Sequence, residues 1–169
     1  MTDARDRITS HVHDDPGVHF NAVVRETDLA AGQVQHHVRR LLDAGDLAVE
    51  RISGRTHYFP PTYDDWERGV VALARRETAR DAISYLLDAG PSRPTEVADS
   101  VGVARSTLEH HLDALTDRGV VEKRRDERNR VTLAVVRPEA TVRLLAAVEP
   151  STADRFVDRF ERLLDDFLD

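Results

Sequence analysis

Two stretches of this chain repeat each other: QHHVRRLLDAGDL at residues 35–47 and EHHLDALTDRGVV at residues 109–121. Both carry two adjacent histidines, a leucine four positions after the second histidine and a glycine further on, at a constant offset of 109 − 35 = 74 residues. Overlaying residues 21–59 on residues 95–133 without a gap extends the match on both sides. An ungapped match of this length indicates two copies of one structural module.

The composition is that of a soluble globular chain. Of its 169 residues, 40% are hydrophobic and 33% are charged, and no run approaches the roughly 20 apolar residues that cross a bilayer. The polar N-terminus lacks the apolar core of a signal peptide, so we expect a cytoplasmic protein without membrane contact. Cysteine is absent, which excludes disulfides, thiolate metal ligands and cysteine nucleophiles.

The charged residues are acidic in sum and unusual in kind. The formal net charge is −7, and Lys123 is the only lysine among 24 basic residues, whereas the 31 acids comprise 20 Asp and 11 Glu. This bias resembles that of proteins from salt-loving archaea. In molar salt the Debye length is about 3 Å, so close-range bidentate hydrogen bonding by arginine would matter more than long-range attraction.

Each copy is predicted to contain three helices at equivalent places. First helices are predicted at Arg5–His13 and Ala79–Asp88, and second helices from the N-cap Asn21 to about Asp28 and from the N-cap Thr95 to about Gly102. These boundaries rest on capping and turn residues. A third helix follows each second helix within a few residues, which is the spacing of a helix-turn-helix.

The third helices are amphipathic and precede predicted hairpins. Apolar residues recur at i, i+4 and i+7, namely Val34, Val38 and Leu41 in the first copy and Leu108, Leu112 and Leu115 in the second. Such a stripe indicates one buried face. Gly45 and Gly119 are expected to cap the helices. Strands are then predicted at Leu47–Ile52 with Thr56–Phe59, turning at Ser53-Gly54-Arg55 and ending at Pro60-Pro61, and at Val120–Arg125 with Val131–Val136.

Further helices are predicted between and after the copies. Residues 62–77, TYDDWERGVVALARRE, form a predicted linking helix with a capping-box variant at Thr62 and Asp65 and a stripe of Trp66, Val70 and Leu73. A helix at Glu139–Val148 precedes a last helix that carries an apolar stripe of Phe156, Phe160, Leu163 and Phe167. An apolar stripe on a terminal helix must face something. We expect a homodimer through this stripe, with packing on the chain's own modules as the alternative.

The motifs resemble those of tandem winged helix-turn-helix regulators of the ArsR-like and MarR-like type found in haloarchaea. The resemblance rests on GVARSTLEHHLDALTDRGVVEKRRDERNRVTL in the second copy and GVHFNAVVRETDLAAGQVQHHVRRLLDAGDL in the first, and it covers about residues 17–136. It implies a mainly α fold with small β-hairpins and a transcriptional regulator whose partner is double-stranded DNA. The expected domains are a first module at 1–61, a linking helix at 62–77, a second module at 78–137 and C-terminal helices at 138–169.

The major groove of B-DNA admits one α-helix, whose N-terminal residues reach the base edges. The polar residues of the third helices are therefore the candidate readers: Gln33, Gln35, His36, Arg39 and Arg40 in the first copy, and Arg105, Ser106, Thr107, Glu109 and His110 in the second. Glutamine pairs well with adenine, and arginine pairs with guanine or phosphate.

The hairpins are the candidate wings, which contact phosphates or the minor groove in the proteins that the sequence resembles. The candidate wing residues are Arg51, Arg55 and His57 in the first copy and Arg124, Arg125, Arg128 and Arg130 in the second. The arginine-rich second wing leads us to expect that the second copy carries more of the DNA affinity. The alternative is that these charges form an ordinary solvated surface.

The paired histidines do not indicate a metal site. Adjacent residues point about 100° apart on a helix, so neither pair can chelate one ion. We expect His37 and His111 at the inner edge of the helix, hydrogen-bonded to the hairpin or its neighbour, and His36 and His110 facing out. His11, His13, Asp14 and Asp15 are possible ligands without a second convergent cluster, so neither a metal nor a cofactor is expected.

No Gly-rich phosphate loop, zinc-protease motif or flanked nucleophilic serine occurs in the sequence. An enzyme is therefore not expected. The function that the sequence favours is a sequence-specific regulator that binds double-stranded DNA. The alternative is an interaction scaffold whose winged helices bind protein, which the fold also permits. The sequence does not identify a small-molecule effector.

Overall fold

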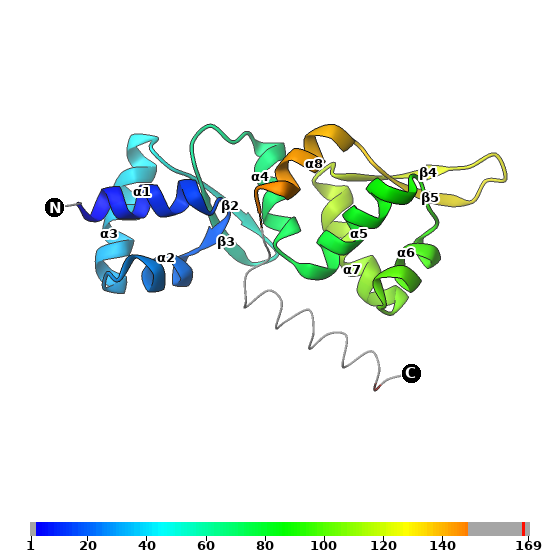
Figure 1. Cartoon of the computed structure of the whole chain (residues 1–169), viewed down its shortest axis with the longest axis horizontal. Coiled ribbons are helices and arrows are strands. Elements are labelled where there is room, and N and C mark those ends of the chain that lie inside the picture. The colour runs from blue at the N-terminus through cyan, green and yellow to red at the C-terminus, as the bar shows by residue number, and fades with distance from the viewer. Residues whose placement is uncertain (1–2, 149–166, 168–169) are drawn as a thin grey trace. The chain divides into compact units, whose positions relative to one another are not determined.

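The structure is a computed structural model that describes residues 3–148 and residue 167. The chain divides into two compact units, Met1–Ala72 and Leu73–Asp169. The described residues are mainly helical, with two small antiparallel sheets (Figure 1). The fold class predicted from the sequence is confirmed.

The first unit is a helical module with a three-stranded sheet. Its elements are α1 (Ala4–Asp14), β1 (Val18–His19), α2 (Phe20–Thr27), α3 (Ala31–Ala44), β2 (Ala48–Ile52), β3 (Arg55–Phe59) and most of α4 (Asp65–Ala74). The strands lie in the order β1-β3-β2, and β1 pairs with β3 through Val18 opposite Tyr58. The sequence did not predict β1, because two residues are too few to show the alternation of a strand.

One apolar core holds the first unit together. Its buried residues are Ile8, Val12, Val18, Val23, Val34, Val38, Leu41, Leu47 and Tyr58. They come from all three helices of the module and from its sheet. The predicted apolar stripe of the third helix is therefore buried.

The second unit repeats this arrangement. Its described elements are α5 (Glu77–Ala89), α6 (Pro94–Val101), α7 (Arg105–Asp117), β4 (Val121–Arg125), β5 (Val131–Val135) and α8 (Pro138–Ala146). β4 and β5 form an antiparallel hairpin, and Ser92 forms an isolated bridge to Leu133. This bridge occupies the place that the Val18–Tyr58 pairing has in the first unit.

Burial repeats at the same offset as the sequence. Adding 74 to the core positions of the first unit, from Ile8 to Leu47, gives residues that are all buried: Ala82, Leu86, Ser92, Val97, Leu108, Leu112, Leu115 and Val121. The repeat thus extends back into the first helices. In the second strand of the hairpin the offset is 133 − 58 = 75 residues and not 74, because Leu133 takes the place of Tyr58. The ungapped sequence alignment is therefore wrong at the hairpin tip, where the second copy is longer.

The helix ends also repeat, and they require unusual backbone conformations. Asp28 ends α2 at φ 55°, and Gly102 ends α6 at φ 79°. Beyond α3 and α7 the backbone N–H of Asp46 donates to the Leu41 carbonyl, and that of Val120 donates to the Leu115 carbonyl, both at 2.9 Å. These six-residue loops are Schellman motifs, which end a helix through a residue in the left-handed region. The predicted C-terminal ends of the second and third helices are confirmed, whereas α4 spans only Asp65–Ala74 of the linking helix predicted at residues 62–77.

Three predicted N-terminal caps are wrong. α2 begins at Phe20, so Asn21 lies inside it, and α6 begins at Pro94, so Thr95 lies inside it. Proline suits the first helical position, because that N–H has no partner within the helix. The capping box of α4 pairs Asp64 with Glu67 through two backbone N–H groups at 2.8 and 3.1 Å, and not Thr62 with Asp65.

Single arginines attach the flanking helices to the modules. Arg68 on α4 contacts Glu50 of β2 at 3.1 Å and donates to the Tyr63 carbonyl at 2.7 Å. Arg80 on α5 donates to the Leu145 carbonyl at 2.8 Å and also to that of Val148, so it caps the C-terminus of α8. The predicted helix at Glu139–Val148 corresponds to α8, whereas the predicted last helix lies outside the described residues.

Two glycines should respond oppositely to the same substitution. Gly32 lies inside α3 with no atom within 4 Å of an added Cβ, whereas Gly102 has a φ of 79°. Gly32→Ala should raise the free energy of unfolding by about 0.5–1 kcal/mol, because glycine costs that much in a helix. Gly102→Ala should lower it by about 1–2 kcal/mol, because a Cβ is strained in the left-handed region. Chemical denaturation of both variants measures the two shifts, and shifts of equal sign would contradict this account.

Candidate nucleic-acid interface

The rotation of α3 determines which of its residues face solvent. Val34, Val38 and Leu41 are buried, and the predicted readers are all exposed: Gln33, Gln35, His36, Arg39 and Arg40. Gln33 also has a local structural role, since its side-chain oxygen accepts the backbone N–H of Ala30 at 3.1 Å and caps the helix. The side-chain oxygen of Gln33 therefore already accepts a hydrogen bond from the chain itself.

The two cations of α3 are available to a ligand. Arg39 and Arg40 are exposed, and neither forms an ion pair or side-chain hydrogen bond with the part of the chain that the structure describes. Guanidinium groups present five N–H donors in a planar fork that matches phosphate geometry. The two arginines can therefore donate hydrogen bonds from this face of α3 to phosphate oxygens or to the acceptor edge of a base.

In α7 the corresponding face is partly neutralised. Leu108, Leu112 and Leu115 are buried, while Arg105, Ser106 and His110 are exposed and Thr107 and Glu109 are half-buried. The Glu109 carboxylate contacts the guanidinium of Arg105 at 3.1 Å and the ammonium of Lys123 at 3.4 Å. Glu109 thus connects the helix to the hairpin. Lys123 was not predicted as a site residue, because nothing in the sequence indicates that a side chain on β4 reaches α7.

The histidine pairs have the predicted orientation in both units. His36 and His110 are exposed, whereas His37 is half-buried and His111 is buried. The ring centroids lie 5.3 Å apart in the first pair and 5.6 Å apart in the second, with interplanar angles of 73° and 74°. The expected hydrogen bond to His37 is not formed at Nδ1, which is buried without a partner among the described residues. Among the described residues no group of three or more possible ligands could hold a metal ion.

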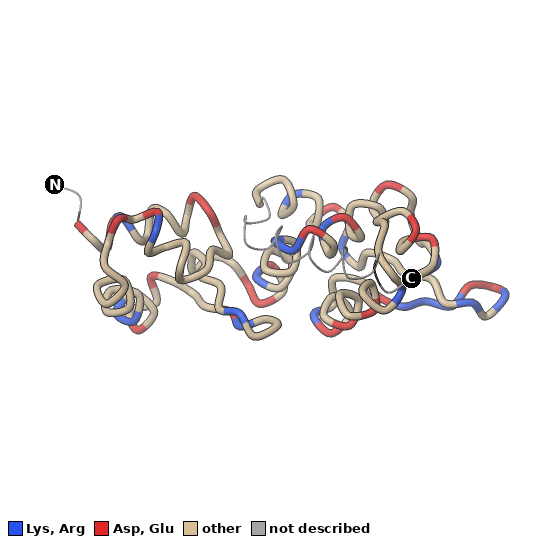
Figure 2. The backbone as a smooth tube through the Cα atoms, turned by 90° about the horizontal axis from the view of Figure 1, so that it is seen from below, with Lys and Arg blue, Asp and Glu red and all other residues tan. Residues whose placement is uncertain are grey.

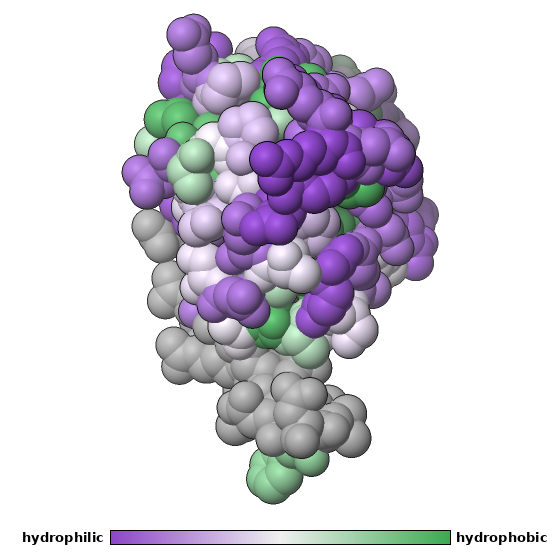
Figure 3. Space-filling view, turned by 90° about the vertical axis from the view of Figure 1, so that its right-hand side faces the viewer, coloured by the Kyte–Doolittle hydropathy of each residue, from purple (hydrophilic) through white to green (hydrophobic). Residues whose placement is uncertain are grey.

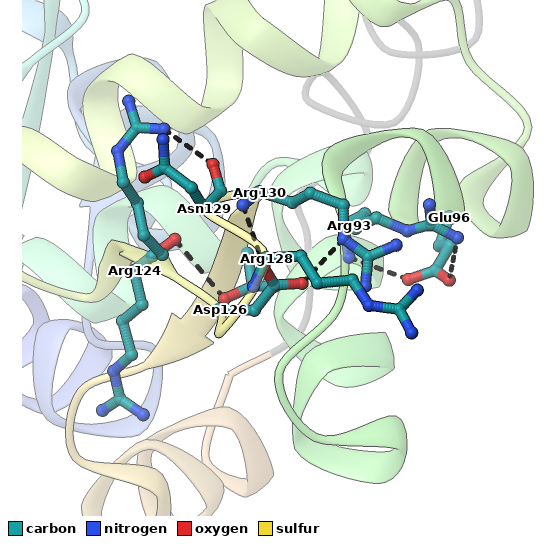
Figure 4. Close-up of polar contacts among 9 residues, drawn as sticks. Arg93, Glu96, Arg124, Asp126, Arg128, Asn129 and Arg130 are labelled. Atoms are coloured by element: carbon teal, nitrogen blue, oxygen red, sulfur yellow. Dashed lines mark hydrogen bonds and ion pairs between the residues drawn. The ribbon is translucent and has the colours of Figure 1, made fainter.

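The tip of the second hairpin is an ordered turn built around Asp126. Its carboxylate accepts the backbone N–H groups of Arg128 and Arg130, both at 2.9 Å, and the Nε of Arg130 at 2.8 Å (Figure 4). Asn129 adopts a left-handed φ of 59°, which asparagine tolerates well. The N–H of Arg130, assisted by its side chain and by the N–H of Arg128, holds the pKa of Asp126 below its usual value.

The second wing exposes four arginines, three of which have partners within the hairpin. Arg124 pairs with Glu122, Arg125 donates to the Asn129 carbonyl at 3.0 Å, and Arg130 pairs with Asp126. The guanidinium of Arg128 has no partner among the described residues. The tube in Figure 2 shows basic segments along the hairpin with an acidic segment between them near its tip. Figure 3 shows strongly hydrophilic residues gathered over part of this end of the molecule, beside paler and hydrophobic residues.

The first wing is smaller and one of its predicted contacts is wrong. Ser53 and Gly54 turn the hairpin at φ 52° and 77°, with Arg51 exposed and Arg55 half-buried. His57 is only 4% exposed, and its Nδ1 lies 2.9 Å from the Gly17 carbonyl. It joins β3 to the chain before β1, so it cannot reach a ligand from the wing. The neighbouring strand β1 covers this side chain, and the ring of His19 lies 4.3 Å from that of His57 between centroids.

The predicted dimerisation residues are largely outside the described part of the chain. This applies to Phe156, Phe160 and Leu163, whereas Phe167 is described and is 86% exposed. Within the described ranges no helix has the length and apolarity that crossing a membrane requires.

Each unit thus contains a module of three helices and a hairpin, with the polar face of the third helix in solvent beside a wing that carries arginine. This arrangement defines a tandem winged helix-turn-helix protein. Comparison with known families agrees. Residues 2–71 match a family described as an N-terminal HTH domain, and residues 76–123 match the family described as bacterial regulatory protein, arsR family.

Two further similarities were found. An uncharacterised HTH-type transcriptional regulator of Methanocaldococcus jannaschii is 24% identical over 131 residues, which are 78% of this chain and 33% of that protein. The chain therefore spans about a third of the length of this curated relative. A crystal structure of a protein from Corynebacterium diphtheriae matches 79% of this chain and 26% of its own, at 14% identity and a TM-score of 0.31, which is too low to support an argument.

The lowered pKa of Asp126 predicts how the second wing responds to acid. A carboxylate with a depressed pKa stabilises the folded turn above its ordinary pKa, and this contribution is lost as the pH falls through the lower, folded pKa. The amide NMR shifts of Arg128 and Arg130 should therefore titrate together, with a midpoint below that of an ordinary aspartate. The variant Asp126→Asn should abolish this titration. A midpoint at or above the ordinary value would contradict the assigned hydrogen bonds.

Proposed function

We propose that the protein is a sequence-specific transcriptional regulator that binds double-stranded DNA through both modules. The observation that carries this proposal is the repeated exposure of polar residues on α3 and α7 beside arginine-bearing hairpins. One helix fits the major groove, and a hairpin next to it lies over the backbone or the minor groove. The proposed activity is binding and not catalysis.

The two modules would use different groups. In the first, Gln35, Arg39 and Arg40 form the reading face of α3, with Arg51 exposed on its wing. In the second, Arg105, Ser106 and His110 form a less basic face, so more of the phosphate contact would come from the wing. His57 has no part in this proposal because it is buried.

The acidic partners of the second module do not prevent DNA binding. Ion pairs at the surface, such as Arg130–Asp126, are weak in water, so a phosphate can displace the carboxylate. These ion pairs do lower the free energy that each phosphate contact contributes to DNA binding. We therefore propose that affinity is shared between the modules, whereas the arginine content alone favoured the second.

The alternative, a scaffold for other proteins, is less well supported. Protein interfaces bury an apolar centre, and the described surfaces of α7 and the second wing expose no large hydrophobic residue. The large exposed apolar residues of the described chain are Val49, Val136, Val142 and Phe167. None of these four lies on the third helices.

Removing the charge of the second wing tests the proposal. Changing Arg124, Arg125, Arg128 and Arg130 together to Ala should weaken binding to specific and random duplexes alike. Each lost phosphate contact should reduce the slope of log K against log salt by about 0.9. Fluorescence anisotropy across a salt series measures this slope. A wing variant that binds as tightly as wild type at every salt concentration would show that the wing is only a solvated surface.

Two controls accompany this experiment. The double variant Arg137→Ala/Arg143→Ala removes two exposed cations that lie outside both the wings and the third helices, and it should leave the slope unchanged. Glu109→Gln should act oppositely to the wing variant. It releases Arg105 and Lys123 from their shared carboxylate, so affinity for random duplexes should rise.

We also propose that the chain forms a homodimer through residues 139–169. The support is the apolar stripe of the sequence together with the exposure of Val142 on α8, at 52%, and of Phe167. Each large apolar side chain left in water forgoes roughly 1.5–3 kcal/mol of burial. A dimer would also allow equivalent recognition helices to read half-sites about 34 Å apart.

Light scattering tests the dimer. Wild type should have the mass of two chains, and Phe160→Asp should have the mass of one, because a buried unpaired carboxylate opposes pairing. Val136→Asp, which changes an exposed valine outside this region, should leave the mass unchanged. A monomeric wild type would exclude the dimer.

A further inference from the structure

The first unit contains a solvent-accessible pocket of about 450 Å³ beside the exposed face of α3. It lies between α2, α3 and β3, and its lining includes Phe20, Gln35, Arg39, Leu42, Asp43 and Tyr58. Pockets of about 300–1,000 Å³ with a mainly apolar lining and a few polar groups are typical of small-molecule sites. Its volume and lining therefore fit a small organic ligand.

The wall of the pocket is apolar and aromatic. Phe20, Leu42 and Tyr58 provide its largest apolar and aromatic side chains. Tyr58 is the register partner of Val49, which is 43% exposed, so an apolar surface continues from the pocket onto β2. An apolar group of a ligand would be removed from water here.

Two opposite charges line the same pocket without neutralising each other. Arg39 and Asp43 are one helical turn apart, about 6 Å along the axis at 1.5 Å per residue. Neither forms an ion pair or hydrogen bond through its side chain with any residue that the structure describes. An arginine four residues before an acid is also the less favourable order for such a pair on a helix.

These charges restrict the class of ligand. A ligand with only a carboxylate would be attracted by Arg39 and repelled by Asp43. A ligand with only an ammonium group would be attracted by Asp43 and repelled by Arg39. A molecule with both groups complements both side chains. The Tyr58 hydroxyl adds a neutral group, and burial moves the pKa of Tyr58 further above neutral pH.

From this geometry we infer that the pocket binds a free α-amino acid with an apolar, branched or aromatic side chain. The carboxylate of the ligand lies against Arg39, its ammonium against Asp43, and its side chain against Phe20, Leu42 and Tyr58. Gly32 also lines the pocket, and an added Cβ there would meet no protein atom within 4 Å. Glycine at this helical position thus leaves room that the chain itself does not fill.

The site is specific to the first module. At the offset of 74 residues, Arg39 corresponds to Asp113, Leu42 to Thr116 and Gly32 to Ser106. The second module therefore presents two acids, Asp113 and Asp117, where the first presents an opposite pair. A ligand would act on one reading helix and not on the other.

Calorimetric titration of the full chain in the absence of DNA tests the site. We expect leucine, isoleucine or phenylalanine to bind with one site per chain. Glycine, 3-phenylpropionate and 2-phenylethylamine, which each lack one of the three groups, should bind at least about tenfold weaker, a loss of about 1.4 kcal/mol. The inference is overturned if no apolar amino acid binds at about 10 mM, or if the analogues with a single charged group bind equally well.

Matched variants locate the site. Arg39→Gln and Asp43→Asn should each weaken binding at least about tenfold, and Gly32→Leu should block the pocket without changing its charge. Arg25→Gln and Asp46→Asn remove exposed charges that do not line the pocket, so both variants should bind the amino acid as wild type does. Equal affinity of the Asp43 and Asp46 variants would place the ligand elsewhere. Far-ultraviolet circular dichroism confirms that each variant is folded.

A consequence for DNA rests on the proposed function. Gln35 and Arg39 line the pocket and also belong to the proposed reading face, so ligand and DNA would compete. At a ligand concentration ten times its dissociation constant, simple competition weakens binding through α3 about elevenfold. A ligand that binds without changing the DNA affinity overturns the competition. A chain that binds the amino acid but no duplex would refute the proposed function alone and leave the pocket in place.

Discussion

Burial of one apolar stripe on the third helix of each module determines the rest of the surface. Val34, Val38 and Leu41 occupy the core of the first unit, which fixes the rotation of α3 about its axis. Once that rotation is set, Gln35, His36 and Arg39 must face solvent, because they lie on the opposite side of a helix with 3.6 residues per turn. A polar replacement in the stripe would therefore alter which residues α3 exposes, although the replaced residue is not among them.

The direction of each chain segment depends on a few backbone positions in the left-handed region. Asp28 and Gly102 turn the chain between the second and third helices, and Gly45 and Gly119 turn it into the hairpins. These residues hold α3 and α7 at a defined place beside their wings. Glu109 then adds an ion pair between α7 and Lys123 of β4. The first module has Gln35 at the equivalent position, and a neutral glutamine cannot form this ion pair.

Local patterns predicted the helices, the C-terminal ends of the second and third helices and the buried stripes, because these features follow from periodicity and turn residues within a few positions, whereas three N-terminal caps were assigned to the wrong residues. The same patterns failed where a distant residue decides. Strand β1 exists because Val18 pairs with Tyr58, forty residues away, and His57 is buried because β1 and the Gly17 carbonyl cover it. The ion pairs of the wing and of Glu109 depend on side-chain positions that no spacing rule gives. The Arg39–Asp43 pocket was likewise invisible, since it needs Phe20 and Tyr58 to close it.

The duplication within one chain has an evolutionary consequence. In an assembly of identical single modules, a substitution in the reading helix appears in every copy, so all half-sites must change together. Here Arg39 and Asp113 occupy equivalent positions and carry opposite charges. Each helix can therefore be selected independently, and one polypeptide can come to recognise two unlike sequences, or a sequence with one half and a metabolite with the other.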